Sequence, residues 1–187
     1  MQTKIRCTWC EKDDLYRNYH DNEWGNPVYD DATLFEFLVL ETFQAGLSWY
    51  TILKKRENFR IAFDQFDCIK VAQYQEDKVL ELLQNEGIIR NQLKIRGTIS
   101  NAIAFIKVQE EFGSFSKYIW GFVNHKPIVN NLKSMAQIKA TTEISDVLSK
   151  DLKKRGFKFV GSTVVYAHMQ ATGMVNDHVA TCWKRTI

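Results

Sequence analysis

The 187-residue sequence predicts an all-α fold. Apolar residues recur at intervals of three and four along most of the chain, which is the spacing of an amphipathic helix. Residues that favour helix N-caps precede these segments, and glycine follows several of them. The alternation of apolar and polar residues that marks a strand is almost absent. Together these observations favour helices over sheet from end to end.

Three helices are expected between residues 30 and 75. Asp30 and Asp31 can cap the first, which Gly46 interrupts. Ser48 can start the second, and Asp67 can cap a short third helix. Each of these side chains can accept a hydrogen bond from the backbone N–H groups that a helix leaves unpaired at its start.

Two further helices are expected from about Glu76 to Asn85 and from Asn91 to Phe112. Gly87 follows the first and suits the left-handed C′ position, and Gly113 closes the second. Gly97 is a weak point in the longer helix, because glycine is less favourable than most residues in a helix interior.

The next stretch mixes helices with a long loop. Ser116 can start a helix, and the polar stretch from Gly121 to Thr142, which contains Pro127, is expected to be a loop. Ser145 can cap the following helix, which stops at Gly156.

A glycine-bounded segment then separates two helical patterns. Residues 157–160 alternate like a strand, but the flanking glycines favour a tight hairpin between helices, and the last helix ends near Gly173. Glycines let the backbone approach a phosphate, and the following helix N-terminus supplies N–H donors. Two glycines in such a turn are also common without any ligand. The candidate DNA-contacting residues are Gly156, Lys158, Gly161, Ser162 and Thr163.

The net charge of +3 permits an anionic partner without requiring one. The basic residues gather in three clusters, which are either solvated helix faces or an indication of a polyanionic partner. The clusters are Lys54, Lys55, Arg56 and Arg60; Arg90, Lys94 and Arg96; and Lys150, Lys153, Lys154, Arg155 and Lys158.

Targeting signals are not visible in the sequence. No apolar run approaches the ~20 residues of a membrane span, and the chain begins without the apolar region of a signal peptide. We therefore expect a cytoplasmic protein that is independent of membranes, and a monomer. In that compartment the four cysteines are reduced thiols or metal ligands rather than disulfides.

Cysteines and histidines near the two ends of the chain can form a metal site. His178 and Cys182 are four residues apart, so on a helical turn they point the same way. Cys7 and His20 complete a Cys₂His₂ set of the kind that holds structural zinc, and Cys7 with Cys10 forms an alternative pair. A single His-x-x-x-Cys spacing is often incidental, but an ion would hold termini that are poor in apolar residues.

Glu41 falls within the apolar stripe of its helix, between Leu38 and Ala45. A buried carboxylate is costly unless it is paired, so it either forms a buried ion pair with arginine or lysine, or lies at the edge of a misplaced stripe, or faces a pocket that awaits a ligand. Aromatic residues are dense near the start of the chain, and Trp49 follows. They are either ordinary core or the walls of a pocket that sandwiches an extruded base. These residues are Trp9, Tyr16, Tyr19, Trp24 and Trp49.

Four sequence segments resemble the DNA-3-methyladenine glycosylase I family of the helix-hairpin-helix glycosylase superfamily. The similarity runs from Cys7 to Cys182 in the family's order, and its motifs are long and specific. The segments are Tyr19-His20-Asp21-Asn22-Glu23-Trp24-Gly25, Gln44-Ala45-Gly46-Leu47-Ser48-Trp49, Gly156-Phe157-Lys158-Phe159-Val160-Gly161 and Val175-Asn176-Asp177-His178.

The resemblance implies a helix-hairpin-helix domain packed against a smaller domain that the two ends of the chain build together. We assign residues 1–30 and 160–187 to the zinc-binding terminal domain and 31–159 to the helical domain, with the hairpin at about 150–172 at their junction. The implied ligands of the structural zinc are Cys7, His20, His178 and Cys182, which leaves Cys10 as a bystander.

The resemblance also implies roles for the pocket residues. Glu41 is the catalytic residue at the bottom of a base pocket lined by Trp49, Tyr19, Tyr16, Trp24 and Trp9. The family lacks the superfamily's usual catalytic aspartate, so Asp177 is not a catalytic candidate.

The expected function is that of a monofunctional DNA N-glycosylase in base excision repair. It flips out 3-methyladenine from double-stranded alkylated DNA and releases the free base. No lysine is an evident Schiff-base nucleophile, so no lyase activity is expected. Two alternatives remain: a non-catalytic zinc-stabilised DNA-binding module, which does not need Glu41 among aromatic rings, and a zinc hydrolase, which needs an open metal position.

Overall fold

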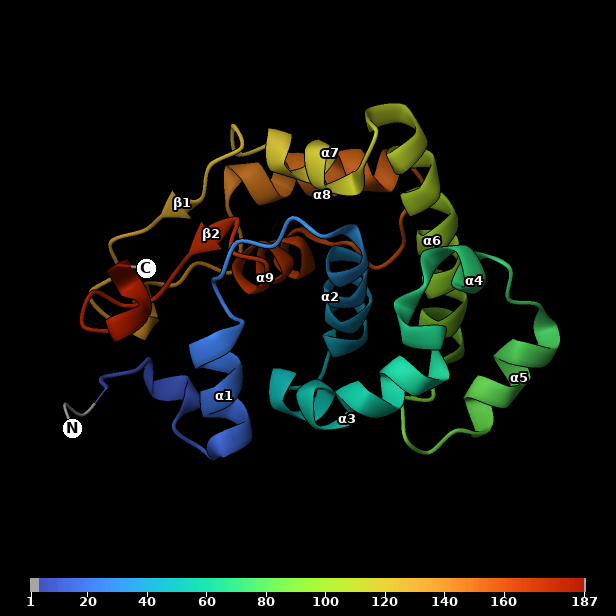
Figure 1. Ribbon diagram of the computed structural model, residues 1–187, viewed down its shortest axis with the longest axis horizontal. Coiled ribbons are helices and arrows are strands. Elements are labelled where there is room, and N and C mark those ends of the chain that lie inside the picture. The colour runs from blue at the N-terminus through green and yellow to red at the C-terminus, as the bar shows by residue number, and fades with distance from the viewer. Residues whose placement is uncertain (1–3, 187) are drawn as a thin grey trace.

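Side-chain caps begin several helices at the residues that the sequence predicts. Asp30, Ser48, Asp67 and Asn91 each accept hydrogen bonds from backbone N–H groups of the first turn that follows them. Gly113 ends the longest helix in the left-handed conformation, with φ of 81°. The computed structural model describes residues 4–186, and within them it confirms the all-α class (Figure 1).

The helices and the two short strands follow one another along the chain, with single 3₁₀ turns at residues 8–10, 64–66, 135–137 and 183–186. The bounds are α1 (Asp14–Asn22), α2 (Asp31–Gln44), α3 (Trp49–Ala62), α4 (Cys68–Ala72), α5 (Glu76–Gln84), α6 (Gln92–Phe112), α7 (Phe115–Gly121), β1 (Ile128–Val129), α8 (Glu143–Lys154), α9 (Ser162–Ala171) and β2 (Val175–Asn176).

Helix α2 lies at the centre of the molecule, in contact with α3, α6, α7 and α9 (Figure 1). Every residue from Leu34 to Phe43 is buried. The predicted apolar stripe therefore describes only part of the buried surface, because a helix enclosed on all sides has no solvent-facing stripe. Glu36 and Glu41 are the two carboxylates inside this enclosed stretch.

Three predicted helix boundaries are wrong, each because a neighbouring side chain provides the cap. Ser114 rather than Ser116 caps α7. Thr142 caps α8, and Ser145 is its reciprocal partner in a capping box. Asn85 ends α5 by accepting a 2.8 Å hydrogen bond from the N–H of Gly87, so Gly87 does not take the predicted left-handed position.

Two elements are absent from the sequence prediction. One is α1, which Asp13 caps by accepting a hydrogen bond from the N–H of Tyr16. The other is a parallel pair in which β1, inside the expected loop, lies beside β2 (Figure 1). Strands of two residues carry no alternating pattern, because their pairing is decided by segments far apart in sequence.

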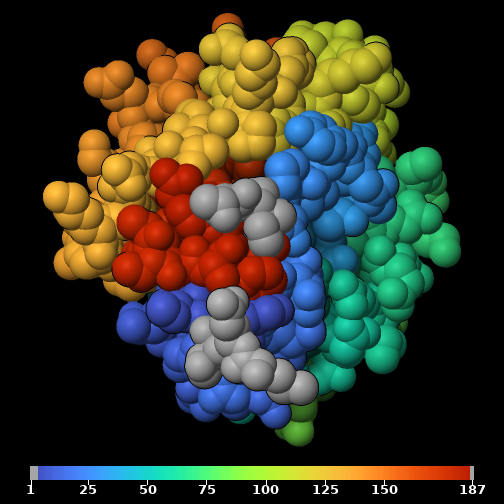
Figure 2. Space-filling view, turned by 60° about the vertical axis from the view of Figure 1, so that its left-hand side comes forward, coloured from blue at the N-terminus to red at the C-terminus, as the bar shows by residue number. Residues whose placement is uncertain are grey.

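The two ends of the described chain lie against each other, as Figure 2 shows for the blue and red segments. The N–H of Trp183 donates to the carbonyl of Ile5 at 2.9 Å, and the N–H of Ala180 donates to the carbonyl of Leu132 at 2.7 Å. Residues from both ends share a second apolar cluster separate from the main core. Its buried members are Cys7, Tyr19, Trp24, Phe37, Leu53, Ala171, Val179 and Cys182.

The segment that follows α1 crosses the end of α9. Gly25 donates to the carbonyl of Gln170 and Val28 to that of Thr172, both at 3.0 Å. The crossing is close: a Cβ at Gly173 would lie 2.3 Å from the carbonyl carbon of Asn26, and Gly173 has φ of 69°. Only glycine fits this crossing, which fixes the segment around Trp24.

Among residues 4–186, no helix has the length and hydropathy that crossing a membrane requires.

Candidate functional site

An aromatic cavity of about 230 Å³ opens between α1, α2, α3 and α9. It contains all six residues that the sequence analysis assigned to a base pocket, and its whole wall brings together four separate segments, 9–24, 41–49, 135–138 and 167–170. Flat rings form most of its wall. The aromatic cavity is lined by Trp9, Tyr16, Tyr19, Trp24, Glu41, Gln44, Trp49, Met135, Ile138, Ala167 and Gln170.

The carboxyl group of Glu41 is the most unusual group in this cavity. The residue is 3% exposed, and its Oε2 atom has no hydrogen-bond partner among the described residues. Burial alone raises the pKa of Glu41 to about 8. No arginine or lysine pairs with it in the described part of the chain, so the ion-pair interpretation is wrong for this residue.

Glu36, five residues earlier on α2, forms the ion pair instead. Its Oε1 atom accepts from Nε of Arg56 at 2.5 Å and from Nε of Arg60 at 3.0 Å. Arg56 also donates at 2.5 Å to Glu23, the residue that directly follows α1. This network holds α1, α2 and α3 together beside the cavity, and it leaves Glu41 as the unpaired carboxyl.

Trp49 contributes the second unpaired polar atom. Ser48 caps α3 and so sets the position of Trp49 as its first residue. The indole ring of Trp49 stacks on the ring of Phe37, with centroids 6.3 Å apart. The guanidinium of Arg56 lies over the ring of Phe37, 5.0 Å from its centroid. The indole Nε1 is buried without a hydrogen-bond acceptor in residues 4–186.

Two tyrosines face the same space. Burial, followed by the charge of Glu41, raises the pKa of Tyr19 well above its ordinary value, so its hydroxyl stays protonated. Tyr16 packs edge-on against Trp9 with centroids 4.8 Å apart. The cavity thus offers hydroxyl and indole donors, one carboxyl group and aromatic faces.

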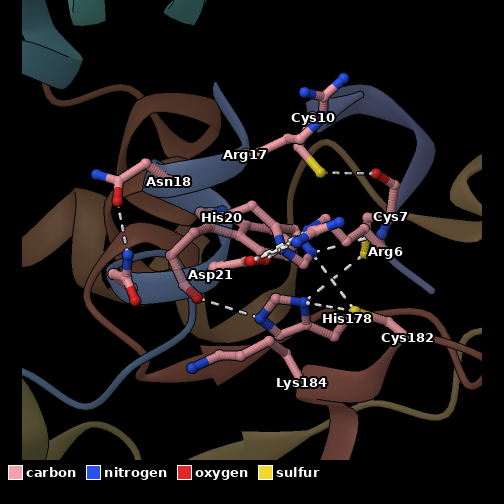
Figure 3. Close-up of polar contacts among 12 residues, drawn as sticks. Arg6, Cys7, Cys10, Arg17, Asn18, His20, Asp21, His178, Cys182 and Lys184 are labelled. Carbon is pink, nitrogen blue, oxygen red and sulfur yellow. Dashed lines mark hydrogen bonds and ion pairs between the residues drawn. The ribbon is translucent and has the colours of Figure 1, made fainter. Parts of the chain in front are cut away.

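Four residues from the two ends of the chain form a buried metal-ligand cluster (Figure 3). The potential ligand atoms of Cys7, His20, His178 and Cys182 lie within 4.8 Å of one another, and all four residues are buried. Cys10 lies apart from them, because its thiol donates to the carbonyl of Cys7 at 3.0 Å. The four clustered residues, without Cys10, could hold a metal ion.

The histidine tautomers suit that role. Nδ1 of His20 donates to Asp21 at 2.9 Å, which leaves Nε2 unprotonated, and this nitrogen accepts from the N–H of Cys7 at 3.4 Å. Nε2 of His178 donates to the carbonyl of Trp24 at 3.1 Å, which leaves Nδ1 free. Both unprotonated nitrogens face Cys182 Sγ, at 3.4 Å from His20 and 3.5 Å from His178.

Polar contacts around the cluster favour the charged forms of Asp21 and Cys182. Burial opposes ionisation of Asp21, but hydrogen bonds from Arg6 and His20 outweigh it and hold the pKa of Asp21 below its usual range. Hydrogen bonding to Cys7, followed by the contacts with His178 and His20, holds the pKa of the Cys182 thiol well below its usual range. The same bond to Cys182, together with burial, raises the pKa of Cys7.

The hairpin joins α8 to α9. Gly156 has φ of 98°, whereas Gly161 has the ordinary extended values of an N-cap. A Cβ at either glycine would meet nothing within 4 Å, so both face open space. Lys158 and Thr163 are exposed, and the Ser162 hydroxyl lies 2.8 Å from that of Ser145.

The three basic clusters differ in how many of their charges are already paired. Arg56, Arg60, Arg90 and Arg96 form ion pairs with glutamates. Lys55 donates to the carbonyls of Glu86 and Gly87. In the third cluster, within the described residues, only Arg155 is in an ion pair. Four lysines beside the hairpin keep their charge available, namely Lys150, Lys153, Lys154 and Lys158.

The sequence analysis missed several residues of the cavity wall. Gln44 lies one helical turn after Glu41, so its spacing could have revealed it. Met135 and Ile138 come from the expected loop, where no pattern marks them. Asp177 is buried and accepts from Asn130, Tyr166 and Gln170, each at 2.7 Å, and it does not line the aromatic cavity.

Comparison with known proteins identifies the family. The chain is 52% identical over 177 residues to DNA-3-methyladenine glycosylase 1 of Escherichia coli (strain K12), which is 95% of each chain. A crystal structure of a 3-methyladenine DNA glycosylase I superimposes with a TM-score of 0.93 at 51% identity, covering 96% of this chain and 98% of that one. A variant of such an enzyme in complex with 3-methyladenine matches with a TM-score of 0.93 at 37% identity, covering 96% and 97%. The family model of methyladenine glycosylases matches residues 9–185, and the chain belongs to that family.

Proposed function

We propose that this protein is a monofunctional DNA N-glycosylase that flips 3-methyladenine out of alkylated double-stranded DNA and excises it. The observation that carries the proposal is the unpaired carboxyl of Glu41 inside a cavity of aromatic rings. A buried unpaired acceptor is costly until a ligand supplies a donor. A flat, cationic purine supplies both donors and a face for stacking. The names of the relatives, and the relative solved with 3-methyladenine, support the same reaction.

Charge gives the cavity its selectivity in this proposal. Methylation at N3 places a positive charge on the nucleotide base. Burial raises the pKa of Glu41 to about 8, so its carboxyl is mostly protonated at neutral pH before a ligand binds. A cationic base favours the carboxylate, while Trp49 stacks on the ring. Neutral adenine gains neither interaction to the same degree.

The chemical step needs little acid catalysis. The bond between C1′ and the base breaks, its electrons neutralise the cationic ring, and 3-methyladenine leaves as a neutral base. Water adds to C1′, and the proton that it loses passes to the solvent. Glu41 acts in this proposal by stabilising the cationic base and the positive charge that develops on the sugar.

DNA contacts are proposed for the hairpin residues Gly156, Lys158, Gly161, Ser162 and Thr163. Both glycines leave open space for a phosphate, and the start of α9 carries unpaired N–H groups. The unpaired lysines of the third basic cluster lie in the same part of the chain. We expect their removal to weaken binding uniformly across DNA sequences and to reduce its salt dependence.

We further propose that the metal is structural zinc. For Zn–S of ~2.3 Å and Zn–N of ~2.05 Å, a tetrahedral site separates sulfur from nitrogen by about 3.6 Å. The three Cys–His distances of 3.4, 3.5 and 3.7 Å fit this value. Four protein ligands fill a tetrahedral ion, which supports a structural role over a hydrolytic one. The proposed zinc-binding terminal domain joins residues 1–30 to 160–187, of which 1–3 and 187 lie outside the described residues.

Lyase activity is not part of this proposal. No lysine lines the aromatic cavity within residues 4–186. Lys94 is buried, but its Nζ donates to two backbone carbonyls. Treatment with borohydride is therefore expected to trap no covalent adduct between the protein and substrate DNA. A trapped adduct would overturn the monofunctional assignment.

The deciding experiment measures release of free 3-methyladenine from methylated duplex DNA by the wild type, Glu41→Gln and Trp49→Ala. We expect release by the wild type and a loss of about 100-fold or more in each folded variant. If folded, metal-loaded wild type binds the DNA but releases no base, the protein is a zinc-stabilised DNA-binding module instead.

A further inference from the structure

A side cavity of about 170 Å³ lies next to the aromatic cavity. It opens between the loop after α2, at Gly46 and Leu47, and the start of α9, at Thr163. It shares Glu41 and the residues Gln44 and Ala167 with the aromatic cavity. A nucleotide that reaches Glu41 from the hairpin side must therefore fit between these two segments. Another part of the protein must fix the distance between them.

Helix α6 holds the hairpin through the amide of Asn101. The Asn101 side chain accepts from the N–H of Lys158 at 2.6 Å and donates to the carbonyl of the same residue at 3.1 Å. Asn101 is fully buried. One side chain thus satisfies both backbone groups of the hairpin residue that carries the exposed lysine.

Gly97, one turn earlier, receives the next hairpin residue. A Cβ at Gly97 would lie 2.7 Å from the Phe159 ring, closer than atoms can approach. Phe159 itself has φ of 58°, which is unusual for a bulky residue. Gly97 lowers the helix propensity of α6, but its lack of a side chain lets the hairpin pack against α6 (Figure 1).

Lys94, one further turn back, holds the loop after α2. Its Nζ donates to the carbonyls of Phe43 and Ala45 at 2.9 and 2.7 Å. The side chain is buried, and this burial lowers the pKa of Lys94. These carbonyls flank Gln44, which lines both cavities.

We propose that this face of α6 positions the two segments between which the DNA enters: Asn101 and Gly97 fix the hairpin, and Lys94 fixes the loop after α2. Residues 94, 97 and 101 are three and four apart, so they share one helix face. None of them lines either cavity, so they are positioning residues. The inference rests on the proposed glycosylase function.

The test separates positioning from helix stability by using substitutions with opposite effects on helix propensity. Asn101→Ala and Gly97→Ala both improve helix propensity, but they remove the anchor or push Phe159 away. Ala104→Gly lowers helix propensity and leaves both anchors intact. For the two anchor variants we expect KM for methylated duplex DNA to rise about tenfold, with kcat within about twofold.

Two further measurements make the result specific. Affinity for free 3-methyladenine should be unchanged in Asn101→Ala and Gly97→Ala, because the aromatic cavity is untouched. Adding Phe159→Leu to Gly97→Ala should recover KM, because the shorter side chain clears the new methyl group. Lys94→Met should weaken binding of both DNA and free base, because the carbonyls that flank Gln44 lose their donor.

The outcomes are distinguishable. Wild-type KM in Asn101→Ala and Gly97→Ala overturns the positioning role, and so does an equal loss of free-base affinity, which indicates general damage. An increase in KM for Ala104→Gly as large as theirs also overturns it. If the wild type releases no base, the proposed function fails, and affinity for undamaged duplex DNA still tests the anchors.

Discussion

The metal-ligand cluster and the aromatic cavity are both buried polar sites, but they treat their polar atoms in opposite ways. In the cluster, the ring nitrogens of His20 and His178 that do not face the sulfurs already donate to Asp21 and Trp24. In the cavity, Glu41 Oε2 and Trp49 Nε1 have no partner among the described residues. In the first site, supporting contacts orient the ligand atoms towards one another, whereas the second site keeps an unpaired acceptor and an unpaired donor among aromatic rings.

This difference separates stability from function. Buried polar groups are normally paired, and each exception asks for an explanation. A cluster with a complete set of supporting contacts is built to hold its shape. A cavity with an orphaned donor and acceptor costs stability that ligand binding can recover. The following predictions test whether the two sites really divide the molecule in this way.

Loss of a metal ligand should have the largest effect. Binding of structural zinc contributes roughly 10–16 kcal/mol in small zinc-dependent folds, which is comparable with the whole stability of a domain. We expect Cys182→Ser to lose the metal and to unfold at least the terminal segments, as measured by zinc content and thermal unfolding. Cys10→Ser is the matched control, because Cys10 is buried nearby and outside the cluster. A folded Cys182→Ser protein would favour an open, catalytic metal.

Glu41→Gln should act in the opposite direction on stability. The folded pKa of about 8 lies above the ordinary value of 4.5, so the folded state retains a proton that the unfolded state loses. Wild-type stability therefore falls as pH rises from 4.5 to 8. In ligand-free protein we expect Glu41→Gln to be about 3–4 kcal/mol more stable at pH 7.5, with little difference near pH 5. Urea unfolding at the two pH values measures this.

Glu36→Gln is the control for that prediction. Glu36 lies on the same helix and is also buried, but it is paired with Arg56 and Arg60. Its neutralisation should destabilise the protein, because it leaves a buried guanidinium without its partner. If both substitutions destabilise, Glu41 is an ordinary core carboxyl and the contrast between the two sites is lost.

Much of the difference between the two sites could be predicted from the sequence, because it depends on patterns of nearby residues. The caps at Asp30 and Ser48, and the position of Glu41 among apolar residues, depend on short-range spacing. Glu41 was expected to have either an ion-pair partner or a ligand, and the spacing of one helix could not decide between them. The decision depends on where Arg56 points, which is set by the packing of α3 against α2.

Other features needed the tertiary structure. The pairing of β1 with β2 and the contribution of Met135 to the cavity join segments that have no local pattern. The role of Gly97 also could not be predicted from the sequence alone. The sequence marks it as a weakness in a helix, and only the position of Phe159 against it explains why glycine is there.

A smaller effect is expected when a supporting contact of the cluster is removed. Asp21 orients His20 and is itself held by Arg6, whose Nη2 donates at 2.8 Å. Such supporting carboxylates typically change metal affinity by about 10- to 100-fold. We expect Asp21→Ala to lower zinc affinity by that factor in a chelator competition while the protein stays folded with saturating zinc. Asp14→Ala, on the exposed face of the same helix, should leave the affinity unchanged.

The smallest effect at neutral pH concerns His168, a buried histidine that belongs to neither site. Its Nε2 donates to the carbonyl of Leu34 at 3.1 Å, and burial lowers its pKa to about 4. The unfolded state therefore takes up a proton below about pH 6.5 while the folded state does not, so stability is lost as pH falls from 6.5 towards 4. Between pH 7.5 and 5, the wild type should lose about 2 kcal/mol more than His168→Leu.

Acid also protonates the ligands of the metal cluster, but this contribution is common to the wild type and His168→Leu. Because His168 forms no hydrogen bond with a residue of the cluster in the described part of the chain, the two contributions should be additive, and their difference isolates His168. Chemical unfolding of both proteins from pH 7.5 to 5 gives that difference directly. Parallel curves would mean that His168 is protonated in the folded state, and the neutral hydrogen bond to Leu34 would then be the wrong description.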